Sequence, residues 1–317
     1  MSKKQHSMAS FVSADTIPIK LFYHPEVSKF VPLHIQWLPT NACNLNCPQC
    51  SCANRDKSLQ MSTLEALKVI KEFAARGCKA VTITGGGEPL MHPGIEDMID
   101  AFHHYGIKIG LVTNGLKLEN ISTYAIEKLT WCRISSMDHR SFDSDYASML
   151  KEVTRCNVAW AFSHVVTDSP NMKTIKRLVN FANANDFTHM RLVFNLLSPE
   201  KADASFSKIR QELKGIDSLV IYQARNSPKP CSSCLIGYVK PLIAPDFKVY
   251  LCCGVQYALK EKSLDLPDEL CMGSALDLDS IYENIKPFST KCVTCYYTAY
   301  NDILSSMYDG IEHKEFI

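Results

Sequence analysis

The chain has 317 residues, enough for one large domain or two ordinary ones. Hydrophobic residues make up 46% and charged residues 21%, which is normal for a soluble globular protein. Lys+Arg 34 nearly balance Asp+Glu 33, so the net charge gives no reason to expect a protein that coats a nucleic acid duplex or a membrane surface. No apolar stretch reaches the roughly 18 residues of a membrane helix. The N-terminal lysines are followed by no apolar run, so we expect neither a membrane span nor a secretory signal.

The fourteen cysteines are unevenly distributed along the chain. Four lie together at Cys43, Cys47, Cys50 and Cys52. Seven more fall in the C-terminal third: Cys231, Cys234, Cys252, Cys253, Cys271, Cys292 and Cys295. Because the sequence shows no export signal, we expect a cytoplasmic protein whose thiols stay reduced. Clustered thiols in such a protein indicate metal binding.

Strand and helix patterns alternate from His34 to about Asn195. The predicted strands, in chain order, are 34–38, 80–84, 108–112, 132–136, 158–165 and 190–194. The predicted helices between them begin at the Ser62 capping box, at Pro93, and at residues 122, 144 and 173. About six βα repeats predict a parallel sheet covered by helices. Six repeats are too few for a closed eight-stranded barrel, so the α/β fold expected is a partial (β/α)6 barrel.

The pattern changes after about residue 205. A helix over 206–213 and a strand over 219–222 precede a β-hairpin, predicted as 240–244 and 248–252 around a Pro245-Asp246-Phe247 turn. The remainder is cysteine-rich and predicted to hold little regular structure, so a bound metal would have to stabilise it. We therefore expect an arm over 1–30, the barrel over 31–225 and a small cysteine-rich domain over 226–317.

The first cysteine group forms a Cys43-x3-Cys47-x2-Cys50 loop directly after the first predicted strand. Three thiolates on one tight loop can each bind one iron of a four-iron cluster, which leaves the fourth iron open to a ligand. The alternative is a zinc knuckle, with Cys52 as the fourth ligand. Zinc sites usually use paired CxxC units, so this spacing favours iron and sulfur.

This loop resembles the signature of the radical S-adenosylmethionine (SAM) superfamily. The resemblance implies that Cys43, Cys47 and Cys50 hold a [4Fe–4S] cluster and that SAM binds its open iron. Thr84-Gly85-Gly86-Gly87-Glu88-Pro89 is similar to the family's glycine-rich SAM motif, in which Glu88 would accept hydrogen bonds from the SAM ammonium. Further residues resemble SAM-binding positions at the next strand ends: Asn114, Ser135 and Asp138. The residue before the third cysteine is usually aromatic in the family and is Gln49 here, which leaves the adenine contact open.

The C-terminal cysteines resemble the "twitch" domain, a shortened relative of the SPASM domain, and in particular that of aminocyclitol-dehydrogenating members. The resemblance implies a second, auxiliary [4Fe–4S] cluster held by two cysteines that flank the hairpin and a later CxxC pair: Cys234, Cys252, Cys292 and Cys295. The alternative is a zinc ribbon built from the Cys231/Cys234 and Cys292/Cys295 pairs. Three thiols, Cys231, Cys253 and Cys271, are then spare or replacement ligands, and Cys253 or Cys271 is a candidate hydrogen-atom donor.

The family resemblance also implies the reaction. A flavodoxin- or ferredoxin-type protein would supply an electron, SAM would be cleaved to methionine and a 5′-deoxyadenosyl radical, and the radical would take a hydrogen atom from the substrate. If the auxiliary cluster accepts a second electron, the outcome is oxidation, dehydrogenation or cross-linking. If a thiol returns a hydrogen atom, the outcome is epimerisation.

The substrate expected from the sequence is a small molecule such as a sugar, cyclitol or nucleoside. The sequence shows no N-terminal leader-binding domain, which disfavours the alternative of a peptide-modifying maturase. Modification of a nucleic acid base is a third possibility. The non-enzyme alternatives are an iron–sulfur electron carrier and a zinc-binding module, and neither gives the Gly85–Glu88 segment a function.

Overall fold

The computed structural model describes residues 23–137, 142–195, 202–223, 229–259 and 265–310. Its main feature is one ten-stranded sheet with the order β11-β10-β9-β1-β2-β3-β4-β5-β6-β7. The first seven strands of the chain are β1 (His34–Trp37), β2 (Ala80–Ile83), β3 (Lys108–Thr113), β4 (Trp131–Met137), β5 (Ala159–Val166), β6 (His189–Phe194) and β7 (Val220–Gln223). All seven run parallel, each beside the next.

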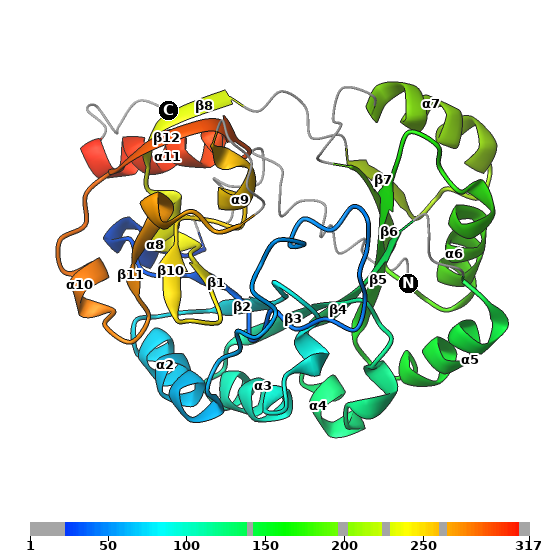
Figure 1. The fold of residues 1–317 in the computed structure, drawn as a ribbon, viewed down its shortest axis with the longest axis horizontal. Helices are drawn as coiled ribbons and strands as arrows, with labels where there is room; N and C mark the ends of the chain where they lie inside the picture. Colours follow the sequence, from blue (N-terminus) through cyan, green and yellow to red (C-terminus); the bar gives the residue numbers. More distant parts are fainter. Residues whose placement is uncertain (1–22, 138–141, 196–201, 224–228, 260–264, 311–317) are drawn as a thin grey trace.

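The connecting helices lie along the outer side of the curved sheet (Figure 1). They are α2 (Thr63–Ala75), α3 (Ile95–His104), α4 (Thr123–Glu127), α5 (Ser144–Val153), α6 (Met172–Ala184) and α7 (Ala202–Leu213). The predicted alternation and the partial α/β barrel are confirmed. The strand predicted over 219–222 is also present, as β7, and extends the parallel sheet by one strand beyond the six repeats.

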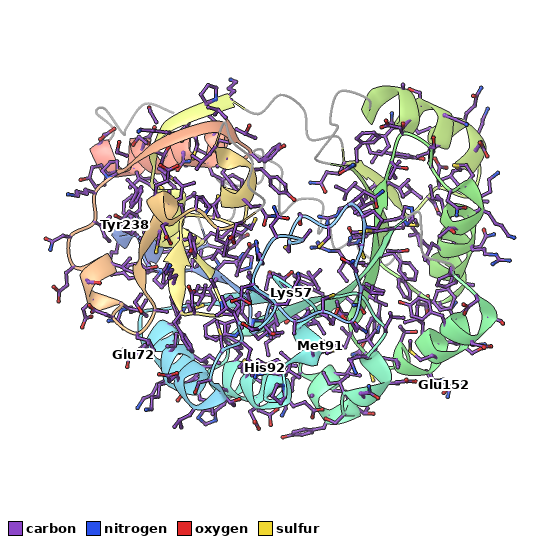
Figure 2. All side chains as sticks on the ribbon, in the orientation of Figure 1. Lys57, Glu72, Met91, His92, Glu152 and Tyr238 are labelled. Atoms are coloured by element: carbon purple, nitrogen blue, oxygen red, sulfur yellow. The ribbon has the colours of Figure 1, made fainter. Side chains whose placement is uncertain are left out.

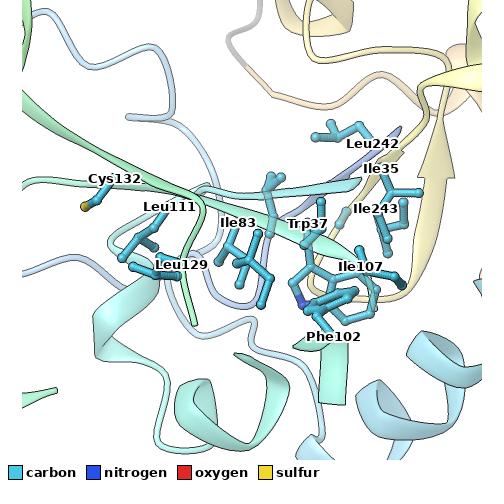
Figure 3. Packing of buried hydrophobic residues seen from close by; sticks show 14 of the residues in the cluster. Ile35, Trp37, Ile83, Phe102, Ile107, Leu111, Leu129, Cys132, Leu242 and Ile243 are labelled. Carbon is cyan, nitrogen blue, oxygen red and sulfur yellow. The ribbon is translucent and has the colours of Figure 1, made fainter. Parts of the chain in front are cut away.

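Local sequence explains where these elements begin and pack. The Ser62 hydroxyl accepts a hydrogen bond from the Glu65 amide (3.4 Å), which caps α2 as predicted, and Gly77 follows it with φ 92°. The core beneath β1 is shown in Figure 3, where the Trp37 ring packs edge-on against the Phe102 ring. The two ring centroids are 5.5 Å apart. This packing fixes the strands, and with them the loops at their carboxyl ends.

The C-terminal part joins the same sheet. β9 (Leu242–Ile243) pairs parallel with β1 on the side opposite β2, and β10 (Lys248–Tyr250) returns antiparallel as the predicted hairpin. β11 (Cys271–Ser274) pairs antiparallel with β10 at the edge. A separate ribbon of β8 (Lys229–Cys234) and β12 (Phe288–Cys295) lies above them (Figure 1). The remaining helices of this part are α8 (Ile236–Val239), α9 (Val255–Ala258), α10 (Asp279–Tyr282) and α11 (Thr298–Asp309).

Two local details differ from the sequence pattern. The second hairpin strand was predicted over 248–252, but β10 ends at Tyr250 and Cys253 lies in the turn before α9. The pattern predicted no strand at Cys271, which begins β11 because the antiparallel pairing with β10 continues to that residue through a register shift. The regular ribbon and α11 show more secondary structure than the cysteine-rich pattern predicted.

The predicted domain limits are only partly within the described residues. Residues 1–22 of the expected arm lie outside them, and Pro25–Lys29 form a short 3-10 helix. The expected boundary at 225/226 also lies outside the described residues. In the described part of the chain, no helix combines the length and apolar character needed to cross a membrane.

Candidate active site

A cavity of about 300 Å³ lies at the carboxyl ends of the parallel strands. Its lining includes predicted site residues from the loops after β1 and β2 and from β3 and β4: Cys43, Cys47, Cys50, Gly85, Gly86, Gly87, Glu88, Asn114 and Ser135. Residues distant in the sequence are thus brought to one place, as expected for a parallel sheet. The predicted site residue Asp138 lies outside the described residues.

The cysteine loop and the glycine loop pack directly on each other. The Gly87 amide donates to the Thr40 carbonyl (3.1 Å), and the Glu88 amide donates to the Ala42 carbonyl (2.8 Å). A Cβ atom on Gly87 would lie 2.0 Å from the Ala42 carbonyl oxygen, and one on Gly86 would lie 1.7 Å from Asn41 Oδ1. Glycine is therefore required here for close contact between the two loops, a reason that the sequence pattern alone did not provide.

The Glu88 carboxylate ties the ends of β2 and β3 together. The side chain is only 2% exposed, and its Oε1 accepts hydrogen bonds from the Thr113 hydroxyl (2.6 Å) and the Leu90 amide (3.1 Å). Its Oε2 accepts from the Asn114 amide (2.6 Å). The Asn114 side chain in turn donates to Asn44 Oδ1 (2.7 Å) on the cysteine loop. This network holds both predicted SAM-binding positions, Glu88 and Asn114, at the cavity wall.

Cys52 also lines the cavity, although the motif assigns it no role. Its amide donates to Cys50 Sγ (3.4 Å), and its own Sγ lies 3.7 Å from the Gly85 carbonyl oxygen. A hydrogen bond between the two thiols lowers the pKa of Cys52 to about 6 and raises that of Cys50, and the Arg55 cation further favours the Cys52 thiolate. The only sequence signal for this residue was its position two residues after the third motif cysteine.

The cysteine loop is contacted by the C-terminal part of the chain. Arg55 is only 5% exposed, and its Nη2 donates a hydrogen bond to Gln256 Oε1 on α9. Its Nε and Nη1 have no hydrogen-bond partner in the part of the chain that is described. The neighbouring residue Tyr257 lines the cavity itself. The cavity is therefore closed on one side by α9, and Figure 2 shows Lys57 on the cysteine loop near the centre of the molecule.

A second group of thiols lies where the β8–β12 ribbon meets α11 and the end of the hairpin. Asn301 Nδ2 is 3.7 Å from Cys231 Sγ and 3.8 Å from Cys234 Sγ, and the neighbouring Cys295 thiol raises the pKa of Cys231. Burial raises the pKa of Cys252, as do the nearby thiols of Cys253, Cys234 and Cys295. The structure therefore groups Cys231 with three of the four predicted ligands.

Cys292, the fourth predicted ligand, lies on the opposite strand of the ribbon. It is paired in register with Cys231, and its amide lies 3.5 Å from the Thr290 hydroxyl. Burial raises the pKa of its thiol, and the nearby Cys295 thiol does the same. The assignment of Cys292 as a ligand stays a prediction, and Cys231 is its direct competitor.

The donor chemistry bears on the kind of metal. Among the described residues, no group of three His, Cys, Asp or Glu side chains is placed to hold one metal ion. A zinc ribbon would need four ligands around a single ion, whereas the ligands of a cubane each bind a different iron. The thiol-only donors of both groups fit iron–sulfur clusters.

The two candidate hydrogen-atom donors lie elsewhere. Cys253 Sγ is 3.0 Å from the Tyr297 hydroxyl, and Cys271 Sγ is 3.4 Å from the Gly273 carbonyl oxygen. Among the described residues that line the cavity, neither thiol is present, whereas Gln49 is. The structure therefore does not bring Cys253 or Cys271 to the predicted SAM site.

Residues 37–155 match the family model described as the Radical SAM superfamily. This segment is similar to radical SAM proteins and carries both loops that the sequence motifs singled out. It spans the cysteine loop, the glycine loop and the ends of β1 to β4, and it stops before the cavity-lining residues of β5 and β6. Radical SAM proteins use SAM and a [4Fe–4S] cluster.

Curated relatives match this chain over limited segments. It is 30% identical to a GTP 3′,8-cyclase of Clostridium perfringens (strain SM101 / Type A) over 172 residues, which is 46% of this chain and 50% of the relative. It is 35% identical to the mycofactocin maturase MftC of Mycobacterium ulcerans over 91 residues, 27% of this chain and 22% of that protein. The chain thus spans about half, or less, of the length of these relatives.

Solved structures share the fold over a larger part of the chain. Streptococcus suis SuiB bound to precursor peptide SuiA superimposes with a TM-score of 0.58 at 15% identity, covering 85% of this chain and 71% of SuiB. The enzyme anSMEcpe, with bound AdoMet and a peptide, gives a TM-score of 0.54 at 15% identity, covering 90% of this chain and 86% of that protein. At this level of identity the similarity is one of fold.

Proposed function

We propose that this radical SAM enzyme oxidises a small molecule, by dehydrogenation or by forming a cross-link. The observation that carries the proposal is the single cavity shared by the Cys43-x3-Cys47-x2-Cys50 loop and the Gly85–Glu88 segment. Cys43, Cys47 and Cys50 would hold the SAM-binding cluster. That cluster, with SAM bound, supplies the reductive cleavage that generates a 5′-deoxyadenosyl radical.

The protein's own residues would bind and orient SAM along the ends of β1 to β4. Glu88, held by Thr113 and Asn114, would accept a hydrogen bond from the SAM ammonium. The Gly85–Gly87 backbone would form the wall beside it. Asn114, Ser135 and the predicted Asp138 would contact the ribose or the carboxylate. Because Glu88 is fixed before SAM arrives, binding would require little reorganisation.

The C-terminal thiols would hold the auxiliary [4Fe–4S] cluster. We assign Cys234, Cys252 and Cys295 as ligands and Cys231, rather than the predicted Cys292, as the fourth. The support for Cys231 is that Asn301 Nδ2 lies within 4 Å of both its sulfur and that of Cys234. This second redox group would accept an electron from the substrate radical, which favours oxidation over epimerisation.

The cavity volume of about 300 Å³ suits a small molecule rather than a folded macromolecule. The similarity to GTP 3′,8-cyclase supports a small-molecule substrate such as a nucleoside, with a sugar or cyclitol as related possibilities. A peptide is the second candidate, supported by the similarity to MftC and by the fold shared with SuiB bound to its precursor peptide.

The reaction would need an external electron donor of the flavodoxin or ferredoxin type. It would take place in the cytoplasm, where thiols stay reduced.

The test is to purify the protein without oxygen, reconstitute it and measure metal and SAM chemistry. Two cubanes predict a brown protein with about eight irons per chain. Reduction in the presence of SAM should then yield 5′-deoxyadenosine. A colourless zinc protein would refute the proposal, and an iron protein that neither binds nor cleaves SAM would be an electron carrier.

A further inference from the structure

Three side chains form a polar row across the inner face of the sheet. The strand register places Ser135 on β4 beside Ser163 on β5, and Ser163 beside Arg191 on β6. All three line the cavity. Arg191 donates to the Ser163 hydroxyl from Nε (3.3 Å) and Nη2 (3.0 Å), so the serine fixes the plane of the guanidinium. The row therefore presents an oriented cation at the cavity wall.

The next row toward the base of the sheet strengthens the positive potential. It consists of Arg133, Ala161 and His189, one alternation below the first row on the same face. Burial lowers the pKa of His189 to about 4, and the neighbouring Arg133 and Arg191 cations contribute. The imidazole is therefore neutral at pH 7, while both guanidinium groups remain charged. This end of the cavity has a positive potential.

The row above is apolar. Met137, Val165 and Val193 occupy the following positions of β4, β5 and β6, and all three line the cavity. Along this wall, a cationic, hydrogen-bonding zone lies toward the base of the sheet, and an apolar zone lies next to it toward the carboxyl ends of the strands. The wall therefore matches a carbon skeleton that carries an anionic group at one end.

The described lining holds two cations and one carboxylate. The cations are Arg191 and Lys57, and the carboxylate is Glu88. Glu88 is bound to β3 through Thr113 and Asn114, and Lys57 is an exposed residue of the cysteine loop that donates to the Cys52 carbonyl. Arg191 is thus the cation that belongs to the rigid sheet wall.

We propose that Arg191, oriented by Ser163, binds an oxyanion of the substrate, a carboxylate or a phosphate, while the adjoining carbons lie against Met137, Val165 and Val193. This inference rests on the proposed function, because the proposed SAM contacts lie at the ends of β1 to β4, whereas Arg191 lies two strands further on. Guanidinium is suited to the task because its planar fork matches carboxylate and phosphate geometry. The substrate class is therefore an anionic small molecule.

The test measures binding of inorganic phosphate and of acetate to the cluster-loaded protein by calorimetry, with and without saturating SAM. Arg191→Met should weaken binding of the preferred anion by about tenfold or more, since a charge-assisted hydrogen-bonded contact is lost. Arg191→Lys should retain part of the affinity, and Ser163→Ala should lose less than Arg191→Met. Two lysines serve as controls: Lys176→Met on the outer helix α6 and Lys57→Met on the cysteine loop.

The arms of this experiment separate the sources of the anion. Tighter phosphate than acetate binding indicates a phosphorylated substrate, and the reverse indicates a carboxylate. If SAM displaces the anion, Arg191 binds the SAM carboxylate rather than the substrate, and the proposal is overturned. It is also overturned if Lys57→Met rather than Arg191→Met abolishes binding, or if folded Arg191→Met and Arg191→Lys proteins bind the anion like wild type. Because the titration without SAM needs no radical chemistry, a failure of the proposed function shows separately, as absent SAM binding or cleavage.

Discussion

The two thiol groups of this protein occupy different surroundings. Cys43, Cys47 and Cys50 lie on an irregular loop and face a cavity, beside a glycine segment and a buried carboxylate. The C-terminal thiols lie between a two-stranded ribbon, the hairpin end and α11, where Asn301 contacts two of the sulfurs. The first group can hold a cluster with one open iron, whereas the second can enclose a cluster entirely with protein ligands.

The difference shows how one fold can separate a site that binds and cleaves SAM from a site that only accepts electrons. An open site needs space, a polar wall and a fixed acidic group, and the ends of the parallel strands supply these. A closed site needs ligands from separate segments, and a cluster bound to all of them would tie the β8–β12 ribbon to the end of the hairpin. Four experiments on single residues and small groups of residues test this contrast.

The largest effect is expected from replacing Cys43, Cys47 and Cys50 together by Ala. Formation of 5′-deoxyadenosine should be abolished, because the variant cannot hold the cluster that binds SAM. Iron should fall from about eight to about four per chain, because the C-terminal group uses separate segments. Iron analysis and product chromatography measure both outcomes. If SAM is still cleaved, the open and closed sites have been assigned to the wrong thiols.

The second prediction concerns the matched pair Cys231→Ala and Cys292→Ala. Cys231→Ala should lose about four irons per chain and become poorly soluble, since the C-terminal unit depends on its metal. Cys292→Ala should keep nearly full iron content, because the proposed ligand set uses Cys231, whose sulfur lies 3.7 Å from Asn301 Nδ2, in its place. The reverse result would restore the ligand set predicted from the sequence.

The third prediction is that Glu88→Gln weakens SAM binding by roughly 10- to 100-fold, since a charged hydrogen bond to the ammonium is replaced by a neutral one. Calorimetry with the cluster-loaded protein measures the affinity. The control is Glu96→Gln, because the Glu96 carboxylate also accepts hydrogen bonds, from Ser122, but lies outside the described cavity lining. Equal SAM affinity in wild type and Glu88→Gln would make Glu88 a purely structural link.

The smallest effect is expected for Gly86→Ala. Its Cβ would meet Asn41 Oδ1 at 1.7 Å, so the variant should lose about 1–3 kcal/mol of unfolding free energy through overpacking. Gly254→Ala is the control, because its Cβ would meet only Cys252 Sγ, at 3.6 Å. Chemical denaturation compares the two variants. A stable Gly86→Ala protein would show that the cysteine and glycine loops can separate without cost.

Much of the barrel could be predicted because its signals are local. The Ser62 cap, the apolar stripe of α3 and the strands after Gly77 and Gly106 each depend on a few neighbouring residues. The grouping of the motif cysteines with Gly85–Glu88 also followed, since parallel strands bring their carboxyl ends together.

What the sequence could not indicate depends on pairings across long separations. The register that sets Cys231 opposite Cys292, and the contact of Asn301 with Cys231 and Cys234, join segments with no shared local pattern. The same holds for Gln256, which reaches Arg55 from the other end of the chain. The row of Ser135, Ser163 and Arg191 likewise becomes visible only when three strands are aligned.

The parallel pairing of β9 with β1 has a consequence for how the chain is made. The Gln36 and Leu38 amides of the β1 segment donate to the Pro241 and Ile243 carbonyls, so the edge of the first strand is covered only by residues synthesised near the end. Until then β1 presents unpaired backbone groups to which a second chain could add. We expect that nascent or truncated chains ending after β7 associate through β1, and that completing the C-terminal unit closes this route to aggregation.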